Sequence, residues 1–290
     1  MIYKNSLGTT ISYIIILTVI AFLGIITLYP FIYTISMSVS DPVAVMRNQV
    51  SLLPIGFHLD SYFKIITDNR VWQAYYNTLW YTLVGTSLNL VLTIMGGYAL
   101  SRRGFRAGRF MMVMITIPMF FGGGMVPNFV LINTLGLYNT RWAIVLPGAV
   151  SSWNLIITRT FFHSTIPDSI PEAAKIEGAN DIQIFTRVII PISGAIIALI
   201  TLFAAVSFWN LYFPAILYTY DIKFHPMTVF LRNIILMGGG DWGDSSEVAI
   251  MNSIQFKYTS IIISILPIIC IYPFLQKYFI KGIMIGSIKE

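Results

Sequence analysis

The sequence predicts an all-α membrane protein with six transmembrane helices and both termini in the cytoplasm. Of the 290 residues, 56% are hydrophobic and 10% are charged, whereas about 25% of the residues of a typical soluble domain are charged. The mean hydropathy is +0.76. The few charges separate long apolar runs, and the basic charges are concentrated on one side of the predicted membrane. Composition, charge-free runs and charge asymmetry together predict this fold class.

The charge-free runs define the spans. A charged side chain at the centre of a bilayer costs about 2.5 to 3.5 kcal/mol, and a helix needs about 17 to 25 residues to cross the hydrocarbon. Six runs meet this length requirement, so the whole chain, residues 1–290, is predicted to form one transmembrane domain. The predicted spans cover residues 11–38, 76–100, 110–136, 142–162, 192–218 and 258–280.

Two of these spans have an alternative or an exception. The first could be a cleaved signal peptide, but its apolar run is too long and no small-x-small cleavage site follows it. The fourth contains Arg159 near its end, where the long side chain can reach the membrane interface.

The basic residues fix the predicted orientation, because cytoplasmic loops of membrane proteins carry an excess of Lys and Arg. Eleven basic residues lie on the side of the two termini: Lys4, Arg102, Arg103, Arg106, Arg109, Arg159, Lys175, Arg187, Lys277, Lys281 and Lys289. Seven lie on the other side, over longer loops: Arg47, Lys64, Arg70, Arg141, Lys223, Arg232 and Lys257. The net charge of +6 is therefore a topology signal that requires no nucleic-acid partner. The basic turn over residues 101–109 could in addition touch anionic lipid or a partner protein.

Several spans and loops are irregular. The third span contains Pro118 and the triplet Gly122–Gly124, which predicts a kinked or unwound helix. The outer region 41–70 is expected to be a surface loop with a short amphipathic helix. The outer loop 221–257 combines glycine and aspartate, but its spacing does not fit a calcium loop, so a flexible loop that contacts a partner is favoured.

The outer end of the fifth span carries Trp209, Asn210 and Tyr212. Two interpretations compete. Aromatic side chains commonly form a belt at the membrane interface. Alternatively, the rings could stack on the apolar faces of a sugar while Asn210 binds its hydroxyl groups, which would make these three residues part of a substrate path.

Residues 167–191 form the only polar segment with strong helix signals between two spans. Ser169 stands three residues before Glu172, which is the spacing of a capping box, and Pro171 falls in the first turn. A helix over residues 171–177 should therefore end in a left-handed Gly178.

A second short helix should follow in the same segment. Asn180 and Gln183 have capping spacing, and the helix should reach Ile190 before Pro191 breaks it. In the predicted topology, this pair of short helices lies in the cytoplasm between the fourth and fifth spans.

The absent motifs restrict the function. The chain has no phosphate-binding loop, no H-E-x-x-H, no C-x-x-C and no G-x-S-x-G motif. We therefore expect no catalytic residue, no cofactor and no metal site in this chain. The spans contain no central Asp, Glu, Lys or Arg of the kind that ion-coupled carriers use, and they show no evident internal repeat. The single cysteine, Cys270, lies in the sixth span and leaves no partner for a disulfide within the chain.

The 167–191 segment resembles a family signature. Glu172-Ala173-Ala174, Gly178 and Val188-Ile189-Ile190-Pro191 match the pattern E-A-A-x3-G-x9-I-x-L-P of the permease subunits of bacterial ABC importers, with Val188 in place of Ile and Ile190 in place of Leu. Within that family the chain resembles the shorter of the two permeases of oligosaccharide importers of the maltose-transporter type. Three further pairs support this resemblance: Asn77-Thr78, Trp209-Asn210 and Lys281-Gly282.

The resemblance implies a set of partners in a bacterial cell membrane. These are a second, homologous permease, two ATP-binding subunits that carry ATP and Mg²⁺, an extracellular solute-binding protein and a sugar substrate. It also implies that the 167–191 segment couples to the ATPase, with Glu172 either a local cap, a partner contact or both. The residues expected to make this contact are Glu172, Ala173, Ala174, Ile176, Gly178, Phe185, Val188 and Pro191.

Two alternatives stay open. Within the family, the solute could be a peptide or a modified sugar. From another class, the chain could be an ATP-independent carrier or a structural membrane subunit, and either would be purified without an ATPase.

Overall fold

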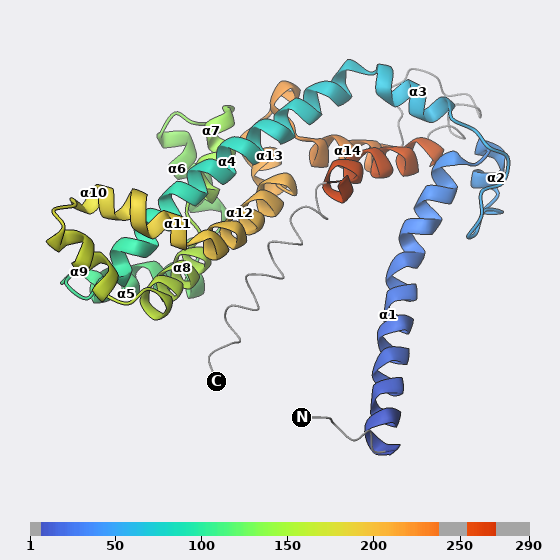
Figure 1. The fold of residues 1–290 in the computed structure, drawn as a ribbon. Coiled ribbons are helices and arrows are strands. Elements are labelled where there is room, and N and C mark those ends of the chain that lie inside the picture. Colours follow the sequence, from blue (N-terminus) through green and yellow to red (C-terminus); the bar gives the residue numbers. More distant parts are fainter. Residues whose placement is uncertain (1–6, 238–253, 271–290) are drawn as a thin grey trace. The chain divides into compact units, whose positions relative to one another are not determined.

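The computed structural model describes residues 7–237 and 254–270 (Figure 1). Regular structure in these residues is helical, and the one β-type contact among them is an isolated bridge between Ser40 and Phe57. The chain divides into two compact units, one of residues 1–69 with 231–267 and one of residues 70–230 with 268–290. The glycine-rich part of the 221–257 loop, the end of the sixth predicted span and the Lys281-Gly282 tail lie outside the described residues.

The first unit begins with α1 (Leu7–Val39), a long helix in which residues 10–39 are long and apolar enough to cross a membrane. Two short helices, α2 (Pro42–Met46) and α3 (Asp60–Thr67), follow in the region where a loop with a short helix is predicted. The helix over Ile254–Cys270 contributes most of its length to this unit.

A buried glutamine joins the elements of the first unit. Gln255 donates from Nε2 to the backbone oxygens of Ser38 and Ser40, at 3.2 and 2.7 Å, and accepts from the hydroxyl of Ser61 at 2.9 Å. Because every polar atom of this side chain is buried and used, the amide connects α1, α3 and the helix that contains Gln255.

The second unit is built on α4 (Asn69–Ser101), the second helix long and apolar enough to span a bilayer. The helices after α4 are α5 (Gly108–Phe120), α6 (Met125–Thr134), α7 (Arg141–Val145), α8 (Ser152–Thr165), α9 (Ser169–Ile176), α10 (Asp181–Gln183), α11 (Ile190–Ile192), α12 (Gly194–Trp209) and α13 (Phe213–Tyr218). A further helix, α14 (Met227–Met237), begins in the second unit and continues from Leu231 in the first. Two 3₁₀ turns, η1 (Leu146–Gly148) and η3 (Ile222–Phe224), and a π-helical stretch, η2 (Ile184–Ile189), lie between these helices.

Small residues let the helices of the second unit approach α4 closely. A Cβ atom added at Gly85 would lie 2.5 Å from the ring of Phe208 in α12, and one added at Gly97 would lie 2.6 Å from Thr158 in α8. Each of two hydrophobic clusters includes a residue of α4, Tyr81 in the first and Ile94 in the second. The first contains Tyr81, Ile144, Val145, Ala204, Phe208, Ala215 and Val229, and the second contains Ile94, Phe162, Ile166, Ile184, Ile189, Ile196 and Ile200.

The predicted break in the third span is confirmed. The chain leaves α5 at Phe120 and re-enters a helix at Met125, and the two helices are bent by 118°. Gly124 has a positive φ of +83°, a conformation that is readily available only to glycine.

The other spans are also divided. The fourth charge-free run becomes α7, η1 and α8, and the fifth becomes α12 followed by α13. By length and composition, two to four spans are recognisable in the described residues, depending on whether each of two bent helix pairs counts as one. The count of six spans and the cytoplasmic termini therefore stay predictions.

Candidate docking surface on the 167–191 segment

The first helix of the segment, α9, begins at Ser169 with Asp168 at the N-cap position. Pro171 lies in the first turn, as predicted. The predicted capping box of Ser169 and Glu172 is wrong, because the helix starts too early for Ser169 to cap it. No side chain caps this helix end. The Asp168 carboxylate is instead bound by two arginines of the preceding basic turn, Arg102 at 3.3 Å and Arg103 at 3.0 Å.

Arg102 makes more contacts than the one with Asp168. Its Nε donates to the Ser101 hydroxyl at 3.0 Å, and its NH2 donates to the backbone oxygen of Phe162 at 3.2 Å. Its guanidinium also lies 4.9 Å from the centre of the Tyr98 ring. One side chain thus holds together the ends of α4 and α8 and the start of α9.

The left-handed turn predicted at Gly178 is confirmed, with φ +88°. The Gly178 N–H donates to the oxygen of Lys175 at 3.1 Å, and the Ala179 N–H donates to the oxygen of Ala174 at 3.0 Å. This pair of bonds is a Schellman motif, which satisfies the last carbonyl groups of α9.

The second helix of the segment is capped as predicted and ends differently. The Asn180 side chain accepts from the Gln183 N–H at 2.8 Å, and the Gln183 side chain accepts from the Asn180 N–H at 3.0 Å. The predicted break at Pro191 is wrong: helical structure continues to Ile192, and the chain bends by 82° only before α12. The wider π turn of η2 precedes Pro191, whose ring would clash with the carbonyl four residues earlier in a regular α-helix.

The segment has one packed face and one exposed face. The packed face joins the second hydrophobic cluster through Ile170, Ala174, Ala179, Ile184, Phe185 and Ile189. The exposed face carries Glu172, Ala173, Ile176 and Ile182. Ile176 is 88% exposed and Ile182 is 75% exposed, which is unusual for isoleucine. A rigid backing with exposed apolar side chains is the form of a surface that another protein covers.

The predicted contact residues divide between these two faces. Phe185 packs against Tyr98, with ring centres 5.2 Å apart, and therefore anchors the segment to its own chain. Val188 is half-buried and Pro191 is exposed. Sequence reasoning missed Ile182. It precedes the buried Ile184 by two residues, which places it about 200° away around the helix and hence on the outside.

The residues of the candidate substrate path also differ in exposure. Trp209 is only 8% exposed and is covered by its own chain. Asn210 is exposed, and its Nδ2 donates to the oxygen of Val206 at 2.9 Å, which leaves its oxygen open to solvent. Tyr212 is half-buried against the first hydrophobic cluster.

The Asn77-Thr78 pair of the resemblance has a structural role in the second unit. Asn77 donates to the backbone oxygens of Lys223 and His225 at 2.8 and 3.0 Å and accepts from Arg141 at 3.0 Å. The hydroxyl of Thr78 accepts from the Met227 N–H at 2.8 Å. Both side chains are buried, so they fix the loop before α14 onto α4.

That loop contains one perturbed carboxyl group. Hydrogen bonds from Lys223 lower the pKa of Asp221. The bond from the ammonium group has the larger effect and the bond from the backbone N–H the smaller one. The ion pair of Asp221 with Lys223 has an N–O distance of 2.7 Å.

Residues 89–285 match the model of a protein family described as the inner membrane component of binding-protein-dependent transport systems. The chain belongs to this family. As a member, this inner membrane component is a transport subunit of a multi-pass membrane system, and the 167–191 segment lies within the matched residues.

Relatives of this inner membrane component match over nearly the full length. The polygalacturonan/rhamnogalacturonan transport system permease protein YtcP of Bacillus subtilis (strain 168) is 36% identical over 269 residues, which are 92% of this chain and 94% of the relative. The arabinooligosaccharides transport system permease protein AraQ of Halalkalibacterium halodurans is 26% identical over 93% of this chain and 94% of its own. A crystal structure of a bacterial ABC transporter involved in the import of the acidic polysaccharide alginate is similar in fold. It has a TM-score of 0.86 and 34% identity, over 95% of this chain and 99% of that chain.

Proposed function

We propose that this chain is the permease subunit of an ATP-driven importer of an oligosaccharide or related sugar, and that the 167–191 segment transmits the work of a separate ATPase. The observation that carries the proposal is the pair of exposed isoleucines, Ile176 and Ile182, on a segment whose other face is locked to the chain. The sugar is supported by the names of the relatives, among them transporters of polygalacturonan and arabinooligosaccharides.

The partners follow from the family. An inner membrane component of a binding-protein-dependent system works with a solute-binding protein, and an ABC importer works with an ATPase. We propose that the assembly contains a second, homologous permease, two ATP-binding subunits and an extracellular binding protein. ATP and Mg²⁺ would bind on the ATPase, because this sequence has no phosphate-binding loop.

The geometry of the segment suits force transmission. The Arg102–Asp168 pair and the second hydrophobic cluster hold the segment to α4, α8 and α12, so a push on its exposed face reaches three helices at once. The small Ala173 on that face allows a partner backbone to approach closely. The bulky Ile176 and Ile182 supply apolar area that becomes buried on docking, which stabilises the contact by about 25 cal/mol per Å².

We also propose six spans with both termini cytoplasmic, which places the docking surface on the side of the ATPase. Single cysteines at the exposed positions Ser169 and Tyr220, each introduced together with Cys270→Ser, test this orientation with a membrane-impermeant maleimide in intact cells. We expect labelling at Tyr220 only. Labelling at Ser169 from outside would reverse the topology.

Copurification with an ATPase is the decisive experiment. The tagged permease is isolated from its native membrane, and the bound proteins are identified by mass spectrometry. We expect an ATP-binding subunit, a second permease and a solute-binding protein, and we expect the double variant Ile176→Asp/Ile182→Asp to lose the ATP-binding subunit alone. Ile55→Asp is the matched control, since Ile55 is an exposed isoleucine in the other compact unit.

The outcomes separate the candidate functions. A chain isolated without any ATPase would be an ATP-independent carrier or a structural subunit, which contradicts the proposal. A solute-binding protein that binds peptides would keep the importer and change the substrate. Retention of the ATPase by the double isoleucine variant would show that the docking surface lies elsewhere.

A further inference from the structure

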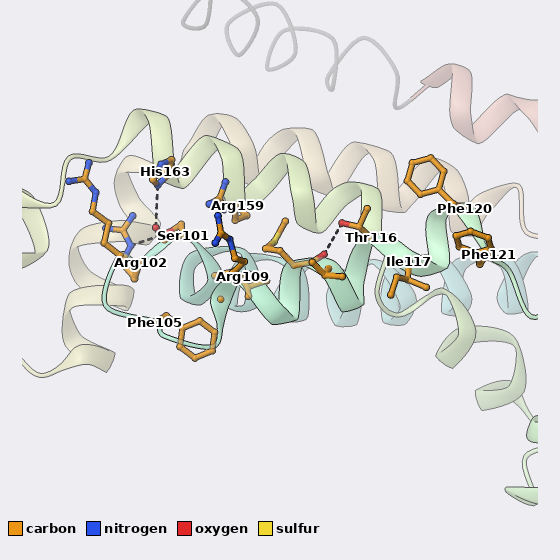
Figure 2. A pocket seen from close by; sticks show the side chains of 15 residues that line it. Ser101, Arg102, Phe105, Arg109, Thr116, Ile117, Phe120, Phe121, Arg159 and His163 are labelled. Atoms are coloured by element: carbon orange, nitrogen blue, oxygen red, sulfur yellow. Dashed lines mark hydrogen bonds between the residues drawn. The ribbon is translucent and has the colours of Figure 1, made fainter.

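A cavity of about 700 Å³ lies in the second unit, beside the basic turn (Figure 2). It extends along α5 from the ends of α4 and α8. One end is basic and contains Arg109, Arg159 and His163, and the other end is apolar and contains Ile117, Phe120 and Phe121. The cavity belongs neither to the docking surface nor to the outer cluster around Trp209.

The basic end has positive charge without a balancing carboxylate. Four arginines and one histidine line the cavity, whereas no Asp or Glu does. Two of the arginines, Arg102 and Arg103, are paired with Asp168. The guanidinium groups of Arg109 and Arg159 have no such partner among the described residues, and the Nε of Arg159 is buried without a hydrogen-bond partner there. A buried donor without a partner is costly, so this end of the cavity is complementary to an anion.

The apolar end lies at a defined distance from the basic end along α5. Arg109 and Phe120 are at opposite ends of α5, eleven residues apart, which corresponds to about 16 Å along the helix axis. Val113 and Ile117 lie between them on the cavity wall and are exposed within the chain. The cavity therefore changes from cationic to apolar over about the length of an acyl chain.

We propose that this cavity binds an anionic phospholipid of the cytoplasmic leaflet. Its phosphate accepts hydrogen bonds from Arg109 and Arg159, and one acyl chain runs along α5 past Val113 and Ile117 to Phe120. The inference rests on the proposed orientation, in which Arg109 lies at the cytoplasmic interface and Phe120 lies deeper in the bilayer. A phospholipid has the same sequence of charge and apolar length from the interface inward.

Other occupants satisfy only part of the cavity. Free phosphate pairs with the arginines and leaves the apolar end uncovered. An apolar helix of the second permease covers Phe120 and Phe121 and leaves two guanidinium groups without an anion. An acidic oligosaccharide supplies charge but has no long apolar segment. The two ends together therefore favour a lipid.

Native mass spectrometry of the assembled complex tests the proposal. The complex is purified in detergent, depleted of lipid and incubated with phosphatidylglycerol or with phosphatidylcholine of the same acyl chains. We expect selective retention of phosphatidylglycerol, falling by about fivefold for each of Arg109→Gln and Arg159→Gln and by about 25-fold in the double variant. Arg106→Gln is the matched control, because Arg106 belongs to the same basic turn but does not line the cavity.

A second variant separates a lipid from its headgroup. Val113→Trp fills the apolar part and leaves both arginines in place, so it should lower phosphatidylglycerol retention while the binding of inorganic phosphate, measured by calorimetry, is unchanged. Equal retention of the two lipids, or full retention by the double arginine variant, would overturn the proposal. Unchanged phosphatidylglycerol retention in Val113→Trp would mean that the site recognises the phosphate group alone.

The remaining outcomes are equally decisive. Lipid bound by the isolated permease but absent from the assembled complex would mean that the second permease covers the cavity. Displacement of the lipid by an acidic oligosaccharide at equal concentration would assign the cavity to the solute. Failure of the proposed function would appear separately, as a permease that copurifies with no ATPase, and the lipid measurement on the isolated permease would still be valid.

Discussion

Arg102 binds Asp168 at 3.3 Å and thereby joins the end of α4 to the start of α9 across 66 residues of sequence. The same guanidinium binds the Phe162 backbone oxygen at the end of α8. The side chain of Arg102 is 19% exposed and that of Asp168 is 34% exposed, so the pair is partly shielded from solvent. The Arg102–Asp168 pair thus helps to orient the proposed docking surface, together with the Arg103–Asp168 pair and the second hydrophobic cluster.

Neutralising the acid of this pair tests that dependence. We expect Asp168→Asn to keep the permease in the membrane but to loosen α9, because the change removes a charge-assisted contact worth about 1 kcal/mol after solvent screening. Local opening of α9 should become about fivefold more frequent. Hydrogen exchange of the α9 amides measures the opening, and uptake with stimulated ATP hydrolysis in vesicles measures the coupling.

The matched control for this variant is Asp181→Asn. Asp181 pairs with Lys175 at 3.7 Å, and both side chains are largely exposed, so the loss of this ion pair should change little. Equal hydrogen exchange in α9 for the two variants would contradict a clamp at Asp168.

Gly178 should tolerate Asn far better than Val. An added Cβ meets no heavy atom within 4 Å, so the cost comes from the φ of +88° alone and is about 1 to 2 kcal/mol for a side chain with a Cβ. Asn enters this conformation more readily than Val. We expect transport to be lost in Gly178→Val and to fall moderately in Gly178→Asn. Membrane abundance should stay near the wild-type level in both variants.

Immunoblots of the membrane fraction and uptake in reconstituted vesicles check this order. Gly104→Val serves as the control, since Gly104 is equally open and has no positive φ. Normal coupled uptake by Gly178→Val would argue against docking through this turn, whereas loss of the protein itself would indicate a folding role.

Two glycines inside long helices should respond in opposite ways to alanine. At Gly97, an added Cβ lies 2.6 Å from Thr158 and 3.1 Å from the backbone nitrogen of Arg159, so α4 and α8 must separate. At Gly24 in α1, no heavy atom lies within 4 Å. We expect Gly97→Ala to lower the melting temperature of the purified permease and Gly24→Ala to leave it unchanged or slightly raise it. Equal effects would show that this approach of α4 and α8 is not tight.

Asn210 is the better probe of the candidate substrate path. Its exposed oxygen can bind a sugar hydroxyl, so Asn210→Ala should raise the KM for uptake by about fivefold, the equivalent of one hydrogen bond. Ser207→Ala, at an exposed position in the last turn of α12 before Asn210, is the control. Unchanged uptake by Asn210→Ala at limiting substrate would favour the alternative interpretation, in which this cluster belongs to an interfacial aromatic belt.

Trp209 should behave differently from Asn210. Because its ring is buried in its own chain, Trp209→Ala leaves a cavity that costs about 3 to 5 kcal/mol. We expect a lower membrane abundance of this variant, visible on an immunoblot of the membrane fraction, before any specific effect on transport. Normal abundance combined with reduced uptake would instead support a sugar platform.

Local sequence signals correctly predicted those features of the docking segment that depend only on neighbouring residues. Gly178 must adopt a left-handed turn, and Asn180 with Gln183 must satisfy the free N–H groups of a helix start, so both features are visible in a few residues. The capping box at Ser169 failed because the helix begins at Ser169 itself, and the Asp168 carboxylate before it is bound by two distant arginines. No pattern within the segment contains that information.

The division of the spans was less predictable for a similar reason. Hydropathy measures how apolar a stretch is, and it cannot distinguish one long helix such as α4 from the bent pair α5 and α6. Glycine and proline near Gly124 indicated that break correctly. Pro191, in contrast, predicted a break at its own position, whereas helical structure continues to Ile192. There, the wider π turn accommodated the proline and moved the bend downstream.

The bend of 82° between the 167–191 segment and α12 forms an elbow. The 16 residues of α12 make an arm about 24 Å long, with Trp209 as its last residue and Asn210 directly after it. If the elbow stays rigid, a tilt of the segment by about 10° moves the far end of this arm sideways by about 4 Å. In the proposed topology, a small rotation at the proposed docking surface is thus converted into a displacement of about 4 Å at the residues of the candidate substrate path.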